Sequence, residues 1–158
     1  MTPAVAAVMD AGAWAVAGVA VGYAASRLPS RLLDHDTALT GLRSWERDGR
    51  AYVRLGVRRW KDRLPEAGAV FRGGISKRSL PGRDMVQLER FRAETRRAEL
   101  VHWALLAVTP LFALWNPPLL LVAMVAYALV ANVPCIIVQR YNRARLARIL
   151  DGAVMVGR

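Results

Sequence analysis

Two carboxylates and a histidine occur at helical spacing within one stretch of nine residues: Glu94, Glu99 and His102. At 100° per residue, Thr95, Glu99 and His102 share one side of a helix, and Glu94 lies at its margin. A histidine with a carboxylate three residues earlier can act as a general base and its orienter. Such a pair would remove the proton from a hydroxyl.

A second polar stretch ends the last apolar run. Asn132, Gln139 and Arg143 share one side of a helix there, and Asn132 could donate to a developing oxyanion. Arginines of both stretches could hold the phosphates of an acyl-CoA or a lipid. We therefore expect catalysis by His102, Glu99 and Asn132, and substrate binding by Glu94, Arg97, Gln139, Arg140, Asn142 and Arg143.

These residues predict acyl transfer to a lipid hydroxyl, with no cofactor and with acyl-CoA as one candidate donor. Glu99 and His102 also have the Glu-x-x-His spacing of di-iron helical bundles. Such bundles need a second copy of the motif and more carboxylates, so we expect no metal. The single cysteine, Cys135, excludes an internal disulfide and a thiol metal cluster.

Apolar and charged residues are segregated along the 158-residue chain, which is 54% hydrophobic and 22% charged. One apolar run with almost no charge precedes a basic central segment, and two more follow it. This is the pattern of a small polytopic membrane protein. The net charge of +11 could indicate nucleic acid, but the apolar runs favour anionic lipid or an anionic substrate instead.

The fold class that follows is all-α: one membrane domain with three transmembrane helices and a basic cytoplasmic segment. We expect spans at about residues 4–28, 98–115 and 118–138, because about 20 apolar residues cross a bilayer core. Residues 29–97 form the cytoplasmic segment, with amphipathic helices, and 139–158 a cytoplasmic tail. Residues 44–64 predict a helix lying on the membrane surface.

Asp84 predicts the start of a helix that continues to Trp115. The glycine-rich stretch 65–77 lacks the spacing of a phosphate-binding loop and predicts a connector.

Positive charge marks the cytoplasmic side of a bacterial cell membrane. The N-terminus is therefore expected outside, with Asp10 solvated at the outer interface, and both basic regions inside. Residues 98–138 then form a hairpin that turns at Asn116. Helix rise places His102 and Asn132 at one depth, about 20 Å from the outer face. If the polar sides face each other, they line a cleft open to the cytoplasm, which a kink at Pro134 would widen.

The stretches 94–103 (ETRRAELVHW), 131–134 (ANVP) and 136–143 (IIVQRYNR) resemble the glycosyl-4,4′-diaponeurosporenoate acyltransferase family. These are small bacterial membrane proteins of carotenoid biosynthesis. The resemblance extends through 57–61 (VRRWK) and covers roughly residues 50–148. It implies an enzyme that esterifies the sugar of a glycosylated carotenoid acid, or a similar glycolipid, with a fatty acyl chain.

A second hypothesis is a non-enzymatic membrane module that binds anionic lipid or scaffolds enzymes of a lipid pathway. It rests on the basic surface segment and predicts that Arg58→Glu and Arg59→Glu matter more than His102→Ala. For the enzyme, the partners are a lipid acceptor, an acyl donor and the membrane, with no nucleic acid. A chain of 158 residues has little protein with which to enclose a long lipid, so a homo-oligomer or a cleft open to the bilayer is a further expectation.

Overall fold

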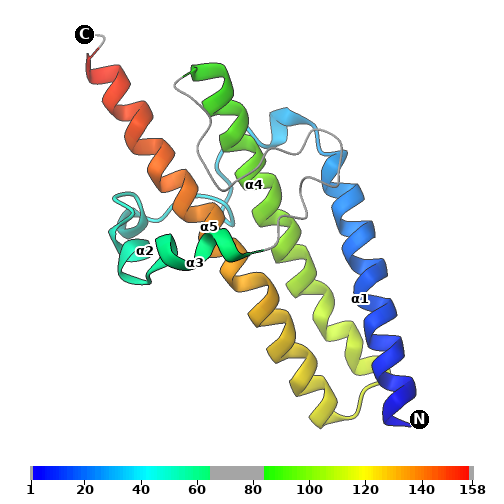
Figure 1. Ribbon diagram of the computed structural model, residues 1–158. Coiled ribbons are helices and arrows are strands. Elements are labelled where there is room, and N and C mark those ends of the chain that lie inside the picture. Colours follow the sequence, from blue (N-terminus) through cyan, green and yellow to red (C-terminus); the bar gives the residue numbers. More distant parts are fainter. Residues whose placement is uncertain (1, 65–83, 157–158) are drawn as a thin grey trace.

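The computed structural model describes residues 2–64 and 84–156, and every regular element in these two ranges is helical. Three long helices lie side by side: α1 (Pro3–Ser26), α4 (Met85–Val108) and α5 (Pro118–Val156) (Figure 1). Each belongs to a segment long and apolar enough to cross a membrane. The all-α fold with three membrane-spanning helices is thereby confirmed. The connector expected at 65–77 lies outside the described residues.

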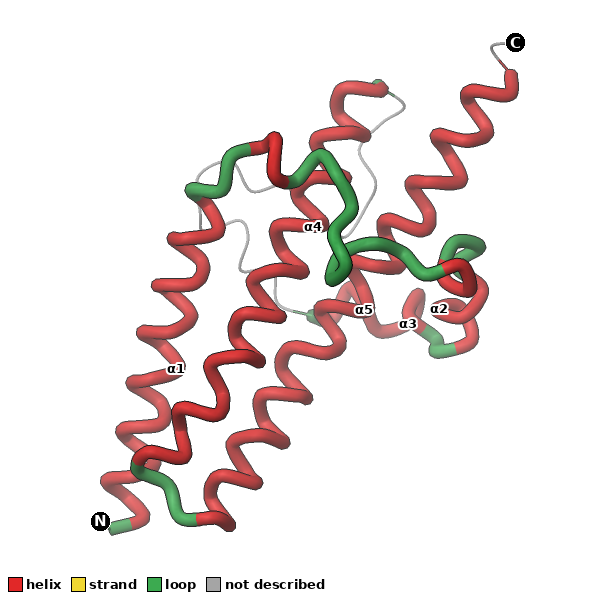
Figure 2. The backbone as a smooth tube through the Cα atoms, turned by 180° about the vertical axis from the view of Figure 1, so that it is seen from behind, coloured by secondary structure: helices red, strands yellow, loops and turns green. Residues whose placement is uncertain are grey.

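Helix α4 starts as the sequence predicts, because the Asp84 carboxylate accepts a hydrogen bond from the backbone N–H of Val86 at 3.1 Å. The chain stays helical beyond Val108 but tightens into the 3-10 helix η5 (Thr109–Leu114). Pro110 lies in the first turn of η5 and has no N–H to continue the α-helical ladder. The chain then turns and enters α5 at Pro118, so α4 and α5 form the predicted hairpin (Figure 2).

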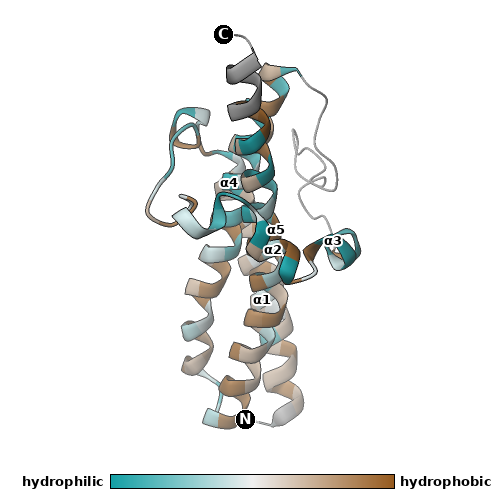
Figure 3. Ribbon diagram, turned by 90° about the vertical axis from the view of Figure 1, so that its left-hand side faces the viewer, coloured by the Kyte–Doolittle hydropathy of each residue, from teal (hydrophilic) through white to brown (hydrophobic). Residues whose placement is uncertain are grey.

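Helix α5 is one element of 39 residues, and at about 1.5 Å per residue it is about 58 Å long. It continues through Pro134. Residues 139–156, expected as a tail, are helical as well. Because about 30 Å suffices to cross the hydrocarbon core, a large part of α5 extends beyond it. Figure 3 shows this change in character, with apolar residues dominating one half of the long helices and hydrophilic residues the other.

The segment 44–63, here called the lobe, is not the single surface helix expected from its periodicity. It consists of η2 (Ser44–Glu46), α2 (Arg50–Arg54), α3 (Val57–Trp60) and η3 (Lys61–Arg63). Gly49 and Gly56 precede α2 and α3 with a φ of +66°, a left-handed conformation that glycine adopts without steric cost.

Two apolar residues of the lobe pack on α5. Tyr52 and Val57 are buried against Val138, Tyr141 and Ala144 of α5. The lobe is therefore attached to one side of α5, as Figure 1 shows. Ahead of it, residues 27–43 contain one short 3-10 helix, η1 (Ser30–Leu32), and otherwise form a loop that passes α4 and α5.

At the turn end of the bundle, Asp10 of α1 is buried rather than solvated. Its Oδ1 accepts hydrogen bonds from Trp115 Nε1 at 2.8 Å and from Asn116 Nδ2 at 2.7 Å. One helical turn away, the Trp14 ring packs between those of Phe112 and Tyr127, with centroids 5.4 and 5.5 Å away. Asp10 thus fastens α1 to the hairpin by polar contacts, and Trp14 by apolar ones.

Replacing Asp10 by alanine should loosen α1 from the hairpin, because Trp115 and Asn116 would lose their shared acceptor. Leaving buried donors unpaired costs about 2 kcal/mol. For a chain of this size that is a fall in Tm of roughly 4 to 8 °C. Thermal unfolding in detergent would measure it, with Met9→Ala as the control because Met9 is exposed. Equal Tm values for the two variants would contradict the fastening role.

Candidate active site

His102 of α4 and Asn132 of α5 face each other in the hairpin. The distance from His102 Nδ1 to Asn132 Oδ1 is 2.9 Å. The Asn132 amide nitrogen donates to the carbonyl of Ala128 at 2.9 Å, so the amide oxygen is the atom that faces the imidazole. Nδ1 of His102 is therefore the donor, and in the neutral ring Nε2 is the proton acceptor. Asn132 is buried and His102 half-buried, so the ring is held but retains an accessible surface.

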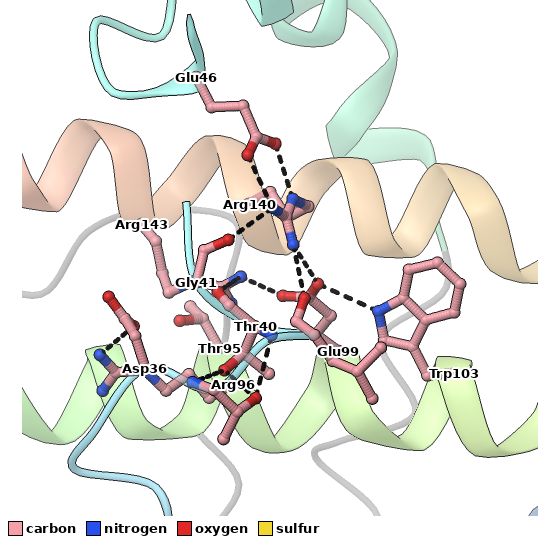
Figure 4. Close-up of polar contacts among 12 residues, drawn as sticks. Asp36, Thr40, Gly41, Glu46, Thr95, Arg96, Glu99, Trp103, Arg140 and Arg143 are labelled. Carbon is pink, nitrogen blue, oxygen red and sulfur yellow. Dashed lines mark hydrogen bonds and ion pairs between the residues drawn. The ribbon is translucent and has the colours of Figure 1, made fainter. Parts of the chain in front are cut away.

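The Glu99 carboxylate is fully buried and bonds to donors other than those expected. Its Oε1 accepts from Trp103 Nε1 at 3.1 Å and from Arg140 Nη1 at 2.7 Å, while Oε2 accepts from Arg143 (Figure 4). These contacts occupy both oxygens. Asn132, and not Glu99, is therefore the residue whose oxygen contacts Nδ1 of His102.

Arg140 connects the hairpin to the lobe. Its guanidinium makes a two-pronged contact with Glu46, Nε to Oε1 and Nη2 to Oε2, both at 2.7 Å. It also donates to the carbonyls of Leu39 and Gly41 at 2.9 and 2.8 Å. Such a fork has the geometry in which arginine binds a carboxylate best. Every nitrogen of Arg140 thus has a partner within the protein.

The loop before the lobe is attached to α4 in a similar way. Arg96 is 2% exposed and donates to Asp36 Oδ1 from Nε at 3.0 Å and from Nη2 at 2.5 Å. Its Nη1 donates to the carbonyl of Leu33 at 2.7 Å. Asp36 and Glu46 were not expected in the site. Their partners are 60 and 94 residues away in the sequence, so no local pattern marks them.

Glu94 and Arg97, expected to bind substrate, contact each other instead, with 3.3 Å between Glu94 Oε1 and Arg97 Nε. Arg97 Nη1 also donates to the carbonyls of Ala25 and Ser26, at 3.2 and 3.1 Å. These carbonyls belong to the last turn of α1, whose oxygens have no partner within the helix. Arg97 therefore caps α1.

Arg143 and Gln139, both expected to bind substrate, have buried polar atoms without a hydrogen-bond partner. Arg143 uses Nη2 for Glu99 and for the carbonyl of Thr40, but its Nε and Nη1 have no partner. One turn earlier on α5, the Oε1 atom of Gln139 also has none. Asn142 is 1% exposed and belongs to the same buried region. Across residues 2–64 and 84–156, no three His, Cys, Asp or Glu side chains come together as a metal site requires.

The pKa of Glu46 reflects these contacts. Burial alone would raise the pKa, but hydrogen bonds from Arg140, Tyr52 and the Arg43 backbone outweigh it and lower the pKa to about 2. The same balance, with Arg96 as the donor, lowers the pKa of Asp36. Both carboxylates are therefore ionised at neutral pH. Their negative charges pair with the guanidinium groups that attach the loop and the lobe to α4 and α5.

Glu99→Gln should be strongly destabilising, because it removes the charge that Arg140 and Arg143 share. Breaking a buried ion pair by removing one partner costs about 3 to 5 kcal/mol. Thermal unfolding in detergent measures the loss. Glu94→Gln is the matched control, since its pair with Arg97 is less buried. If both variants lost the same small amount of stability, Glu99 would not be the centre of the network.

The stabilisation from Glu46 should depend on pH in a defined window. Its pKa is about 2 in the folded chain against an ordinary value of 4.5, so folding favours the ionised form. The contribution is complete above pH 4.5 and is lost as the pH falls to about 2. The Tm difference between wild type and Glu46→Gln should then be constant from neutral pH down to 4.5 and shrink below it. A difference unchanged at pH 2 would contradict this assignment.

Comparison with known proteins agrees with the resemblance seen in the hairpin stretches. The sequence model of the glycosyl-4,4′-diaponeurosporenoate acyltransferase family matches residues 34–152, which include the lobe, α4 and the site on α5. The protein of that name from Staphylococcus aureus strain bovine RF122 / ET3-1 is 30% identical over 139 residues, 87% of this chain and 83% of the relative. Its counterpart from strain MRSA252 is 29% identical with the same coverage.

No solved structure matches the chain. The family match nevertheless confirms the expectation of an acyltransferase enzyme. It begins at residue 34, after α1, and so rests on the elements that build the site. The chain belongs to the glycosyl-4,4′-diaponeurosporenoate acyltransferase family.

Proposed function

We propose that this acyltransferase transfers a fatty acyl group to a sugar hydroxyl of a glycosylated carotenoid, or of a similar glycolipid, at the inner leaflet of the membrane. The observation that carries the proposal is the His102–Asn132 pair, with 2.9 Å between Nδ1 and Oδ1. It orients a histidine ring inside an apolar helix pair, with Nδ1 as the donor and Nε2 as the basic nitrogen. The substrate class comes from the printed name of the relatives.

In the proposed reaction, Nε2 of His102 takes the proton from the acceptor hydroxyl. The hydroxyl oxygen then attacks the carbonyl carbon of the donor, and the imidazolium returns the proton to the leaving group. Asn132 keeps the ring in the required tautomer and orientation, which is what an asparagine can do for a histidine base. No cofactor is needed. The pair comes from one chain, so the chemistry does not require a second copy.

Glu99, Arg140 and Arg143 are positioning residues in this scheme. Glu99 precedes His102 by three residues, about 4.5 Å along α4. Because Glu99 is clamped by two arginines of α5, the two helices are locked in register one turn from the catalytic pair. A slip of α5 by one residue would move Asn132 away from His102.

The orientation of the chain supports reaction at the inner leaflet. Residues 27–97 contain 18 of the 23 lysines and arginines and residues 139–158 the other five, and the turn between η5 and α5 carries no charge. By the distribution of lysine and arginine, the lobe end belongs on the cytoplasmic side and the N-terminus outside. His102 then lies in the inner half of the bilayer, about 20 Å from the turn end.

Lipid mass spectrometry of cells with and without the gene would test the proposal, with His102→Ala and Asn132→Ala as further arms. An acylated glycolipid should be present with wild type and fall at least about 100-fold in His102→Ala, the lower range for loss of a general base. Asn132→Ala should fall less, because the base is still present but no longer oriented.

Val101→Ala is the matched control, since Val101 neighbours His102 on α4 and is equally half-buried. It should behave as wild type. Unchanged product in His102→Ala would remove that residue from the mechanism. If no lipid changes with the gene at all, the non-enzymatic module becomes the better explanation.

A further inference from the structure

The site is closed at its lobe end. One turn from His102 toward the lobe, Glu99 has no exposed surface, and Arg143 and Arg96 are each 2% exposed. The loop before the lobe lies across this position, since Arg140 and Arg143 bind its backbone at Leu39, Thr40 and Gly41. A molecule approaching between α4 and α5 from the water at the lobe end meets a layer of paired charges.

The arginines packed inside this closed end of the site are already engaged. Arg140 donates all its nitrogens to Glu46, Glu99 and two carbonyls, and Arg96 donates all of its own to Asp36 and Leu33. Arg97 caps α1. Within the described residues, the guanidinium nitrogens without a hydrogen-bond partner at this end are Nε of Arg97 and Nε and Nη1 of Arg143, and all three are buried. A soluble thioester such as acyl-CoA carries several phosphates, which would need open cations here.

The side of the helix pair at the level of His102 and Asn132 is apolar, unlike the charged lobe end. Two neighbours of Asn132 on α5 expose apolar side chains, with Leu129 at 48% and Val133 at 36%. His102 itself is half-buried. At its depth in the proposed orientation, about 20 Å from the turn end, this surface meets acyl chains and not water. The open approach to the base is therefore through the lipid.

We infer that the acyl donor is a phospholipid of the same membrane, which makes the enzyme a lipid-to-lipid transacylase. This inference rests on the proposed function. The acceptor sugar oxygen forms a new C–O bond with the acyl carbonyl carbon, and the bond from that carbon to the glycerol oxygen breaks. The proton passes from the sugar hydroxyl to His102 Nε2 and then to the glycerol oxygen. The products are an acylated glycolipid and one lysophospholipid, and neither oxidant nor reductant is required.

The experiment uses the purified full-length protein in phosphatidylglycerol vesicles that contain the glycolipid fraction of cells lacking the gene. In one arm the phosphatidylglycerol carries deuterated acyl chains and no thioester is present. In the other the phospholipid is unlabelled and deuterated palmitoyl-CoA is added outside and inside. Mass spectrometry follows the acylated glycolipid and lysophosphatidylglycerol, with His102→Ala as the blank in both arms.

The expected result is a deuterated product in the first arm, with lysophosphatidylglycerol formed in equal amount, and unlabelled product in the second. Label entering only from palmitoyl-CoA would overturn the donor assignment and leave the acyltransferase standing. Absence of product from wild type in both arms would instead count against the proposed function, and with it the inference.

A blocking variant tests the lateral approach separately. Val133→Trp places a large side chain beside Asn132 on the exposed apolar surface and should lower the phospholipid-dependent rate at least 10-fold. Val122→Trp is the matched control, because Val122 is 65% exposed on the same helix but lies three turns nearer the turn end. Equal rates in the two variants, with thermal stability unchanged, would contradict entry through this surface.

Discussion

The buried carboxylate of Glu99 is the group on which the arrangement of this protein depends. Charges removed from water are costly unless they are paired and hydrogen-bonded, and Glu99 pairs with two arginines of the neighbouring helix. Arg140 extends the network to Glu46 and so to the lobe. One carboxylate therefore determines how α4 meets α5 and where the preceding loop runs.

The same network separates two environments. Toward the turn end, the hairpin is mainly apolar, and His102 and Asn132 contact each other within it. Toward the lobe end, the helices carry charges that are largely satisfied within the protein. This gradient follows the long axis of the molecule (Figure 3). The proposed base, His102, lies at this boundary, where charged residues are close and the surroundings are of low polarity, so that hydrogen bonds are stronger than in water.

The hairpin could be predicted from the sequence because its signals are local. Hydrophobic run length gives the spans, Asp84 gives the start of α4, and helix rise gives the matching depths of His102 and Asn132. The contacts of Glu99 and Asn132 could not be predicted, because they depend on which donor reaches which oxygen. Arg140 is 41 residues from Glu99 and 94 from Glu46, and no periodicity relates them. The lobe was mispredicted because periodicity places Val53 and Val57 on one helix, while Gly49 and Gly56 change the chain direction.

Asp10 has a consequence for the order in which the chain assembles in the membrane. Its two hydrogen-bond donors follow it by 105 and 106 residues, so they have not been synthesised when α1 reaches the bilayer. In the proposed orientation the carboxylate must cross before its donors exist, and it stays hydrated at the far surface until the hairpin inserts. Insertion of the hairpin then takes the carboxylate out of water. Asp10 can thus fix α1 against the hairpin only after the hairpin has inserted, so α1 is the first helix to be made but is not fixed until the last step of assembly.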